Sequence, residues 1–212
     1  MNDLFVLTAD ADAQAVMREV LGRPHALGIR NIAFAVDRHV GRDSGMIKDG
    51  PELTKFQKGG FGHLLLLLDY HGSGREKESV DALQHALSAR LDAVTWKERH
   101  LAVVAVPELE EWLWHSPDAL LKHVQVSEQE MERWLAEFAK RSGRDVEWLR
   151  REQPKELFEH LIFKKERRRP RPFDFEKIAR VASLTDWQQS RSFRMIAEGL
   201  RQWFPIKFGD EE

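Results

Sequence analysis

The first half of the chain contains short, uninterrupted apolar runs of the kind that form strands buried on both faces of a sheet. These runs lie at residues 4–8, 31–36, 64–68 and 101–106. The third run consists of five consecutive leucines and leads directly into Asp69. It is too short to cross a bilayer and it does not alternate with polar residues, so it predicts a central parallel strand.

The segments between these runs have helical spacing or turn composition. Residues 13–21 and 76–91 each place their apolar side chains on one helical face. Residues 37–50 are polar and contain glycine, which predicts a long loop before a short helix near residues 51–57. Strands that alternate with helices predict an α/β fold with a mostly parallel, Rossmann-like sheet flanked by helices.

From about residue 126 onward the pattern is helical only. Ser127 stands three residues before Glu130, which is the capping-box spacing of a helix start. Further helices are expected over residues 154–163, 173–184 and 192–204. We therefore expect an α/β domain over residues 1–125 and an all-helical C-terminal region over residues 126–212.

Composition narrows the functional classes. The chain has 212 residues, a net charge of -2 and no cysteine. A globally basic nucleic-acid coat, a thiolate nucleophile and a cysteine zinc site are excluded. Acidic residues stand near the start where a signal peptide needs basic ones, and no apolar run reaches spanning length. We expect a cytoplasmic protein that makes no membrane contact.

Acidic residues follow three of the predicted strands. Asp10 and Asp12 come after the first strand, Asp69 ends the leucine strand together with His71, and Glu108 and Glu110 follow the fourth. The carboxyl ends of parallel strands meet at one edge of a sheet, where ligands bind. Carboxylates gathered there repel one another unless a cation lies between them.

These residues predict a divalent-metal site for Mg²⁺ or Mn²⁺. We expect Asp10, Asp69 and Glu108 to be catalytic residues and metal ligands, assisted by His71 and Glu110. The ion would activate water to attack a phosphodiester, and a second ion or Arg42 would stabilise the leaving charge. The alternative for each acid is structural: Asp10 or Asp12 caps a helix, and Glu108 and Glu110 complement a helix dipole.

A basic segment near the C-terminus is a candidate nucleic-acid contact. The stretch FKKERRRPRPF (163–173) contains six basic residues around one glutamate. Lysine and arginine in an accessible segment contact phosphates. The candidates are Lys164, Lys165, Arg167, Arg168 and Arg169, together with Arg42 in the HVGRDSG loop. A solvated loop or a protein contact is the alternative. No G-x-G-x-x-G follows the first strand and no G-x-S-x-G occurs, which argues against a dinucleotide oxidoreductase and against a serine hydrolase.

The acid pattern also resembles a known family. The segments TAD (8–10), LLDYHGSG (67–74), VPELEEWLWHSPDALL (106–121) and QPKELFEHLI (153–162) are similar to Toprim-like proteins of the OLD-nuclease and RloB kind. They resemble most closely the small Toprim-like component of a bacterial methylation-associated anti-phage system. This resemblance implies a Toprim-like core and a multi-gene defence cluster with ATPase, methyltransferase or kinase-like partner proteins.

The chain departs from the Toprim pattern at two positions. Toprim domains carry a glutamate and a glycine after the first strand, where this chain has Thr8, Ala9 and Asp10. Their third-strand motif is D-x-D or D-x-E, and His71 replaces the second acid here. The resemblance is therefore compatible with two functions: a metal-dependent nuclease with an altered motif, or a catalytically inactive binding, assembly or sensor subunit of a defence complex.

Overall fold

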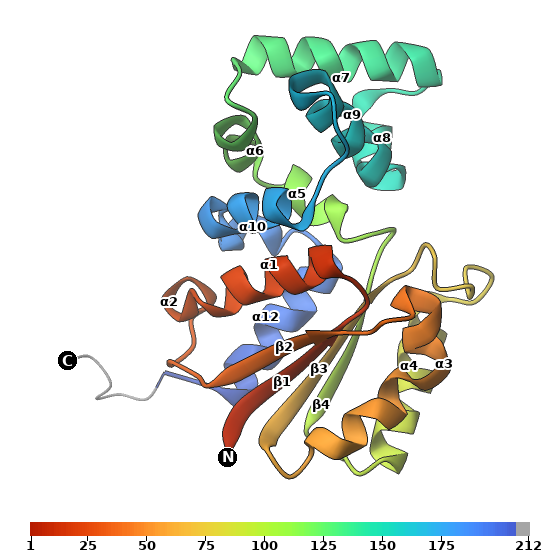
Figure 1. Cartoon of the computed structure of the whole chain (residues 1–212), viewed down its shortest axis with the longest axis vertical. Coiled ribbons are helices and arrows are strands. Elements are labelled where there is room, and N and C mark those ends of the chain that lie inside the picture. Colours follow the sequence, from red (N-terminus) through yellow and green to blue (C-terminus); the bar gives the residue numbers. More distant parts are fainter. Residues whose placement is uncertain (207–212) are drawn as a thin grey trace.

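The computed structural model describes residues 1–206 of the chain. Its sheet has four parallel strands in the order β2-β1-β3-β4. They are β1 (Asn2–Thr8), β2 (Phe34–Arg38), β3 (Phe61–Asp69) and β4 (His100–Ala105). The predicted α/β class with a parallel sheet and flanking helices is confirmed. Because the strands run in one direction, their carboxyl ends meet at a single edge (Figure 1).

Helices cover both faces of the sheet and its carboxyl edge. They are α1 (Ala11–Leu21), α2 (Pro24–Leu27), α3 (Arg42–Leu53), α4 (Val80–Ala93), α5 (Glu110–Trp114), α6 (Pro117–Val124), α7 (Glu128–Ser142), α8 (Val146–Glu152), α9 (Pro154–Glu166), α10 (Pro172–Val181), α11 (Leu184–Trp187) and α12 (Arg191–Trp203). Helices α1 and α12 lie on one face, α3 and α4 on the other, and α5–α9 extend beyond the carboxyl edge (Figure 1). No helix in the described part of the chain combines the length and apolar character of a membrane span.

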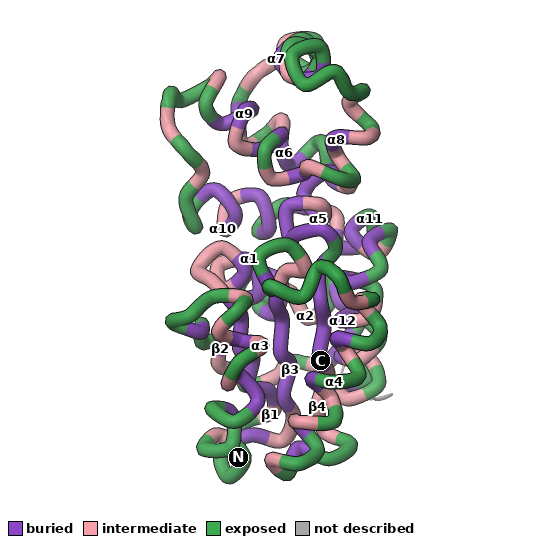
Figure 2. Tube along the Cα trace, turned by 90° about the vertical axis from the view of Figure 1, so that its right-hand side faces the viewer, coloured by how far each residue is buried: buried purple, intermediate pink, exposed green. Residues whose placement is uncertain are grey.

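The leucine run forms the buried centre of the sheet, as predicted. Leu65 and Leu67 pack with the α1 and α12 side, whereas Leu64 and Leu66 pack with the α3 and α4 side. All four are at most 1% exposed. Full burial of one leucine stabilises a fold by roughly 1.5–3 kcal/mol. Figure 2 shows the strands as a buried column inside exposed helices. The run therefore fixes β3 in the middle and places Asp69 at the edge.

The structure corrects the expectation for residues 37–57. The second strand begins at Phe34 rather than at Asn31, and the expected loop contains helix α3, followed by the 3-10 turn Thr54–Gln57. The helix forms despite its glycines because Met46 is fully buried and anchors it to the core. A Cβ on Gly45 would lie 2.5 Å from the His39 ring, so this close approach requires glycine.

The C-terminal helices fall into two groups. The helices predicted after residue 126 are present, and Ser127 caps α7 by accepting a hydrogen bond from the Glu130 N–H. Helices α7–α9 lie beyond the sheet edge, whereas α10 packs beside α1 and α12 beside β4 (Figure 1). Arg23 Nη1 donates to the carbonyls of Ala179 and Ala182 at 2.8 Å, which ties α10 to the N-terminal half. The boundary at residue 125 stays a prediction.

Candidate functional site

The candidate site is the carboxyl edge of the sheet, where six acids lie near the strand ends. We call this group the acidic edge. It comprises Asp10, Asp12, Asp43, Asp69, Glu108 and Glu110. Asp10 and Asp12 follow β1, Asp43 lies in the first turn of α3, and the two glutamates follow β4. The edge faces α5 and the helices beyond it (Figure 1).

Asp10 has a structural function in addition to its place in the acidic edge. Its Oδ1 accepts a hydrogen bond of 2.9 Å from the Ala13 N–H and caps α1. The capping alternative that the sequence left open therefore holds for Asp10. Asp12 lies in the first turn of the same helix, and burial together with the nearby Asp10 raises the pKa of Asp12 to about 6.

Asp69 joins three segments at the end of β3. Its Oδ1 accepts from the Leu109 N–H at 2.9 Å, and its own N–H donates to Asp43 Oδ1 at 2.8 Å. Burial and the repulsion from Glu110 and Asp43 raise the pKa of Asp69 well above its ordinary value. The carboxylate is therefore held in a fixed orientation close to other negative charges.

Glu108 and Glu110 are the most buried acids of the edge, at 8% and 5% exposure. Burial raises the pKa of Glu108, and burial together with repulsion from Glu108 raises the pKa of Glu110 to about 8. Lys155 opposes both shifts. These glutamates therefore lie in an environment that disfavours negative charge and would be stabilised by a cation.

Lys155, from the first turn of α9, supplies positive charge to the acidic edge. Its Nζ lies 3.6 Å from Glu108 Oε1. Burial alone would lower the pKa of Lys155, but the attraction of Glu110 and Glu108 outweighs it and raises the pKa, so the ammonium stays charged. The side chain remains 44% exposed, which leaves it accessible to a ligand.

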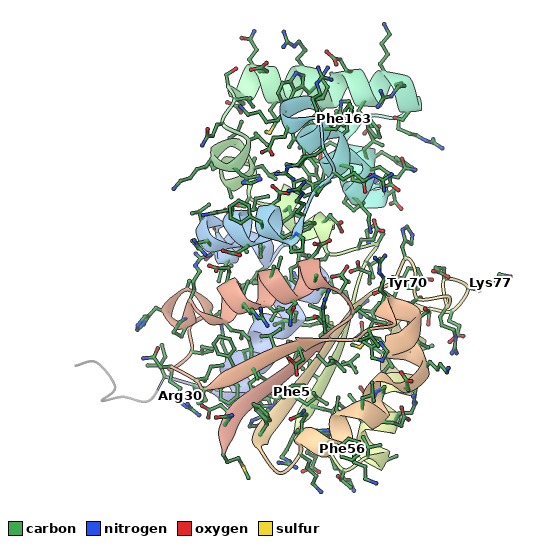
Figure 3. All side chains as sticks on the ribbon, viewed as in Figure 1. Phe5, Arg30, Phe56, Tyr70, Lys77 and Phe163 are labelled. Atoms are coloured by element: carbon green, nitrogen blue, oxygen red, sulfur yellow. The ribbon has the colours of Figure 1, made fainter. Side chains whose placement is uncertain are left out.

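His71 lies at the rim of the edge. It is exposed, its backbone N–H donates to the Pro107 carbonyl at 3.0 Å, and its ring stacks on Tyr70. In the same loop, the N–H groups of Gly72 and Gly74 donate to Glu76 Oε1 at 2.9 and 3.2 Å. This carboxylate occupies the glycine turn that follows β3. The loop projects away from the sheet near Tyr70 (Figure 3).

The two predicted nucleic-acid segments lie in different places. Arg42 is exposed at the start of α3, with a left-handed φ of 54°, and its charge acts on Asp12. The basic segment forms the C-terminal end of α9 and the link to α10. Lys155 lies at the other end of α9, in its first turn. Lys164 pairs with Glu137 at 2.6 Å and Arg168 pairs with Asp174 at 2.6 Å.

The other three residues of the basic segment make weaker contacts. Lys165 Nζ donates to the Gln125 carbonyl at 3.3 Å. The Arg167 guanidinium lies 5.7 Å from the centre of the Phe163 ring. Arg169 lines a groove between α7 and α9. The structure thus brings Asp10, Asp69, Glu108 and Glu110 together and leaves the basic segment outside that group.

The acidic edge has the donor chemistry of the predicted ion. Carboxylate oxygens are the donors that Mg²⁺ and Mn²⁺ prefer. Within residues 1–206, no three histidine, aspartate or glutamate side chains are arranged so as to enclose an ion. Mg²⁺ is commonly held by one or two protein carboxylates together with water and a substrate phosphate. An ion held by Asp69 and Glu110 on the protein side would match this donor chemistry.

Two residues of the site, Asp43 and Lys155, were not among the predicted ligands. Asp43 lies in a segment whose glycines predict a loop, so its helix and its approach to β3 were not expected. Lys155 follows Pro154 at a helix start, within the segment QPKELFEHLI, but no spacing connects it to the strand-end acids. Both reach the edge through tertiary packing, for which the sequence provides no local signal.

Comparison of the chain with family models, with curated proteins and with solved structures gives no match. Function is therefore inferred from the residues, the fold and the acidic edge.

Proposed function

We propose that this chain is a Toprim-like component of a bacterial anti-phage defence system whose acidic edge binds Mg²⁺ or Mn²⁺ and hydrolyses phosphodiester bonds. The observation that carries the proposal is the convergence of strand-end acids with one lysine. The charge of Glu110 raises the pKa of Asp69, the charge of Glu108 raises the pKa of Glu110, and Lys155 supplies only one positive charge. A divalent cation would relieve the remaining repulsion.

The residues of the acidic edge would have different functions around such an ion. Asp69 and Glu110 would hold it, because Glu110 is buried at the strand ends and Asp69 is oriented by the Leu109 N–H. The ion would supply Lewis-acid activation of water and charge neutralisation at the phosphate. Lys155 keeps its ammonium protonated beside Glu108 and would face the phosphate charge. Asp10 keeps one carboxylate oxygen outside its helix cap.

Cleavage and metal-binding assays test this proposal. We would incubate labelled single-stranded DNA, RNA and duplex DNA with the full chain in Mg²⁺ or Mn²⁺, and titrate Mn²⁺ calorimetrically. Asp69→Asn and Glu110→Gln are expected to lose activity by at least about a hundredfold. Glu111→Gln is the matched control, because Glu111 follows Glu110 on α5 but pairs with His115. Absence of both Mn²⁺ binding and cleavage would reject the nuclease function.

A second function is favoured by the lysine itself. The ammonium of Lys155 already provides one positive charge to Glu108 and Glu110, as a structural ion pair would. On this alternative, the chain is an inactive Toprim-like assembly or sensor subunit that works beside ATPase, methyltransferase or kinase-like proteins. It predicts that Asp69→Asn leaves protection against phage intact in cells carrying the gene cluster, whereas the nuclease function predicts that protection is lost.

A further inference from the structure

A groove of about 590 Å³ runs between α7 and α9. We call it the α7–α9 groove. Its lining includes the cationic residues Arg141, Lys164, Arg167 and Arg169. Arg141 comes from α7 and the other three from the end of α9 and the segment after it. Two distant stretches of the chain therefore contribute positive charge to one concave surface.

Three of these cations are available to a ligand. Lys164 is paired with Glu137. Within residues 1–206, by contrast, no carboxylate forms an ion pair with Arg141, Arg167 or Arg169. Two of them lie over aromatic rings: Arg141 is 5.2 Å from the centre of Phe138, and Arg167 is 5.7 Å from the centre of Phe163. Their charge is thus positioned by ring contacts rather than neutralised.

A buried histidine orients Arg141. His160 Nε2 lies 3.1 Å from the Trp134 carbonyl and must donate to it, because a carbonyl only accepts. Nδ1 is then the acceptor, at 3.3 Å from Arg141 Nη2. This contact uses one guanidinium nitrogen and carries no negative charge. The remaining N–H groups of Arg141 therefore keep their capacity to bind an anion.

The groove also presents an aromatic surface. Phe163 is 48% exposed, although it is large and apolar. It lies among the side chains between α7 and α9 (Figure 3). An exposed ring beside guanidinium groups is the arrangement with which proteins hold unpaired bases, because each base can stack on a ring while cations contact its phosphate. A base inside a duplex cannot offer its face in this way.

The opposite end of the groove leads toward the acidic edge. Glu156 and Glu159 line that end, Arg167 and Arg169 lie at the other end, and Arg141, which contacts His160, lies between them. Glu156 follows Lys155 in α9 and raises the pKa of Glu108 through its charge, which places it close to the edge. A strand bound along the groove would therefore be directed toward Lys155 and the acids.

We propose that the α7–α9 groove binds single-stranded nucleic acid, with Phe163 stacking on a base and Arg141, Arg167 and Arg169 contacting phosphates. This inference rests on the proposed function in one respect, because it names a single strand as the substrate class of the acidic edge. Binding in the groove requires no metal, so the two proposals can be tested separately.

The test measures binding of the full chain to labelled oligothymidylate and oligouridylate of about twelve nucleotides. Fluorescence anisotropy is recorded in EDTA at several salt concentrations. Phe163→Ala is expected to weaken binding roughly tenfold. Arg167→Gln with Arg169→Gln is expected to reduce the slope of log affinity against log salt by about 0.7 for each phosphate that the protein no longer neutralises. The two oligonucleotides distinguish DNA from RNA.

Matched controls come from other surfaces. Phe56→Ala removes another exposed phenylalanine, which is 85% exposed and lies at the other end of the molecule from Phe163 (Figure 3), and Arg151→Gln removes an arginine whose side chain is 72% exposed. Both should bind as the wild type does. Asp69→Asn should also bind while losing any cleavage, so failure of catalysis and failure of the groove give different results. The inference is overturned if neither oligonucleotide binds, if Phe163→Ala has no effect, or if duplex DNA or polyglutamate competes as well as the single strand.

Discussion

The guanidinium of Arg168 donates to both carboxylate oxygens of Asp174, at 2.6 and 2.7 Å. Asp174 is completely buried, and it also accepts hydrogen bonds from His123 Nε2 at 2.9 Å and from the Arg171 N–H at 2.7 Å. A buried carboxylate with this many charged and neutral donors is a structural centre. It closes the turn between α9 and α10 and joins that turn to α6.

This pair predicts that one arginine of the basic segment is needed for stability. Arg168→Gln is expected to lower the free energy of unfolding by roughly 2–4 kcal/mol, because it leaves the buried charge of Asp174 without its bidentate partner. The neighbouring Arg167→Gln should change it by less than about 0.5 kcal/mol, because Arg167 is exposed. Urea unfolding of both variants makes the comparison. Equal effects would contradict the structural assignment of Arg168.

The same carboxylate predicts a pH dependence. Burial alone would raise the pKa of Asp174, but the hydrogen bonds from Arg168 and His123 outweigh it and hold the pKa well below its ordinary value. In the unfolded chain the pKa is near 3.8, so the stabilisation is present above that pH and is lost as the pH falls below it. The difference in unfolding free energy between wild type and Asp174→Asn should be largest at neutral pH. It should shrink below about pH 4, and a constant difference would contradict the assignment.

Two substitutions of Asp43 separate the contribution of its hydrogen bond from the contribution of its charge. Its Oδ1 accepts from the Asp69 N–H at 2.8 Å. Asp43→Ala removes the acceptor and should destabilise the protein by about 1–2 kcal/mol, whereas the amide oxygen of Asp43→Asn can still accept. Thermal unfolding and exchange of the Asp69 amide hydrogen measure the two effects. The expectation fails if the asparagine variant exchanges as fast as the alanine variant.

Glu110 predicts that the metal-free protein becomes less stable as the pH rises. Burial and the charge of Glu108 raise its pKa from 4.5 to about 8 in the folded state. Between these values the folded chain holds a proton that the unfolded chain has released, so stability falls with increasing pH. Glu110→Gln should remove this fall and gain roughly 2–4 kcal/mol relative to wild type between about pH 5 and pH 8. Urea unfolding in EDTA measures the free energy of unfolding of wild type and Glu110→Gln at each pH, with Glu111→Gln as control. A difference between the two proteins that does not change with pH would contradict the raised pKa of Glu110.

The sequence was sufficient to predict where the acids lie along the sheet. An uninterrupted apolar run is buried on both faces, parallel strands align their carboxyl ends, and Asp10, Asp69 and Glu108 each follow a run. The site could be located because it depends on strand direction, which local patterns determine. Its details depend on side-chain contacts between segments. The use of Asp10 as a cap and the approach of Lys155 to Glu108 were therefore not determined by the sequence pattern.

The basic segment shows a second feature that the sequence does not predict, namely which of its charged side chains are paired within the protein. Its arginines and lysines have similar chemistry, yet Arg168 is held by Asp174 while Arg169 lines an open groove. The partner of Arg168 is set by the turn between α9 and α10, and the charge that completes the groove comes from Arg141 in α7. Only the packing of these helices distinguishes a structural arginine from an available one.

Helix α3 shows the same limit for secondary structure. Its glycines predict a loop over residues 37–50, and Pro51 lacks the N–H that would bond the carbonyl of Ile47 one turn earlier in a continuous helix. In the folded chain Arg90 of α4 supplies the donor that the Ile47 carbonyl lacks. Its guanidinium donates to the Ile47 carbonyl and, at 2.7 Å, to the Lys48 carbonyl. A tertiary contact thus stabilises a helix that local propensity disfavours.

A double-mutant cycle tests this compensation. Arg90→Met should lower the free energy of unfolding by about 1–2 kcal/mol, because the Ile47 carbonyl loses its donor. In a Pro51→Ala background the new N–H can bond Ile47 within the helix, so the same Arg90→Met change should cost less, by roughly 0.5–1 kcal/mol. Arg75→Met is the control, because Arg75 forms an exposed ion pair with Glu78 in the segment before α4. Urea unfolding of the four variants measures the coupling. An equal cost of Arg90→Met in both backgrounds would mean that Arg90 stabilises α3 through Glu52, with which it also forms an ion pair, and not through the Ile47 carbonyl.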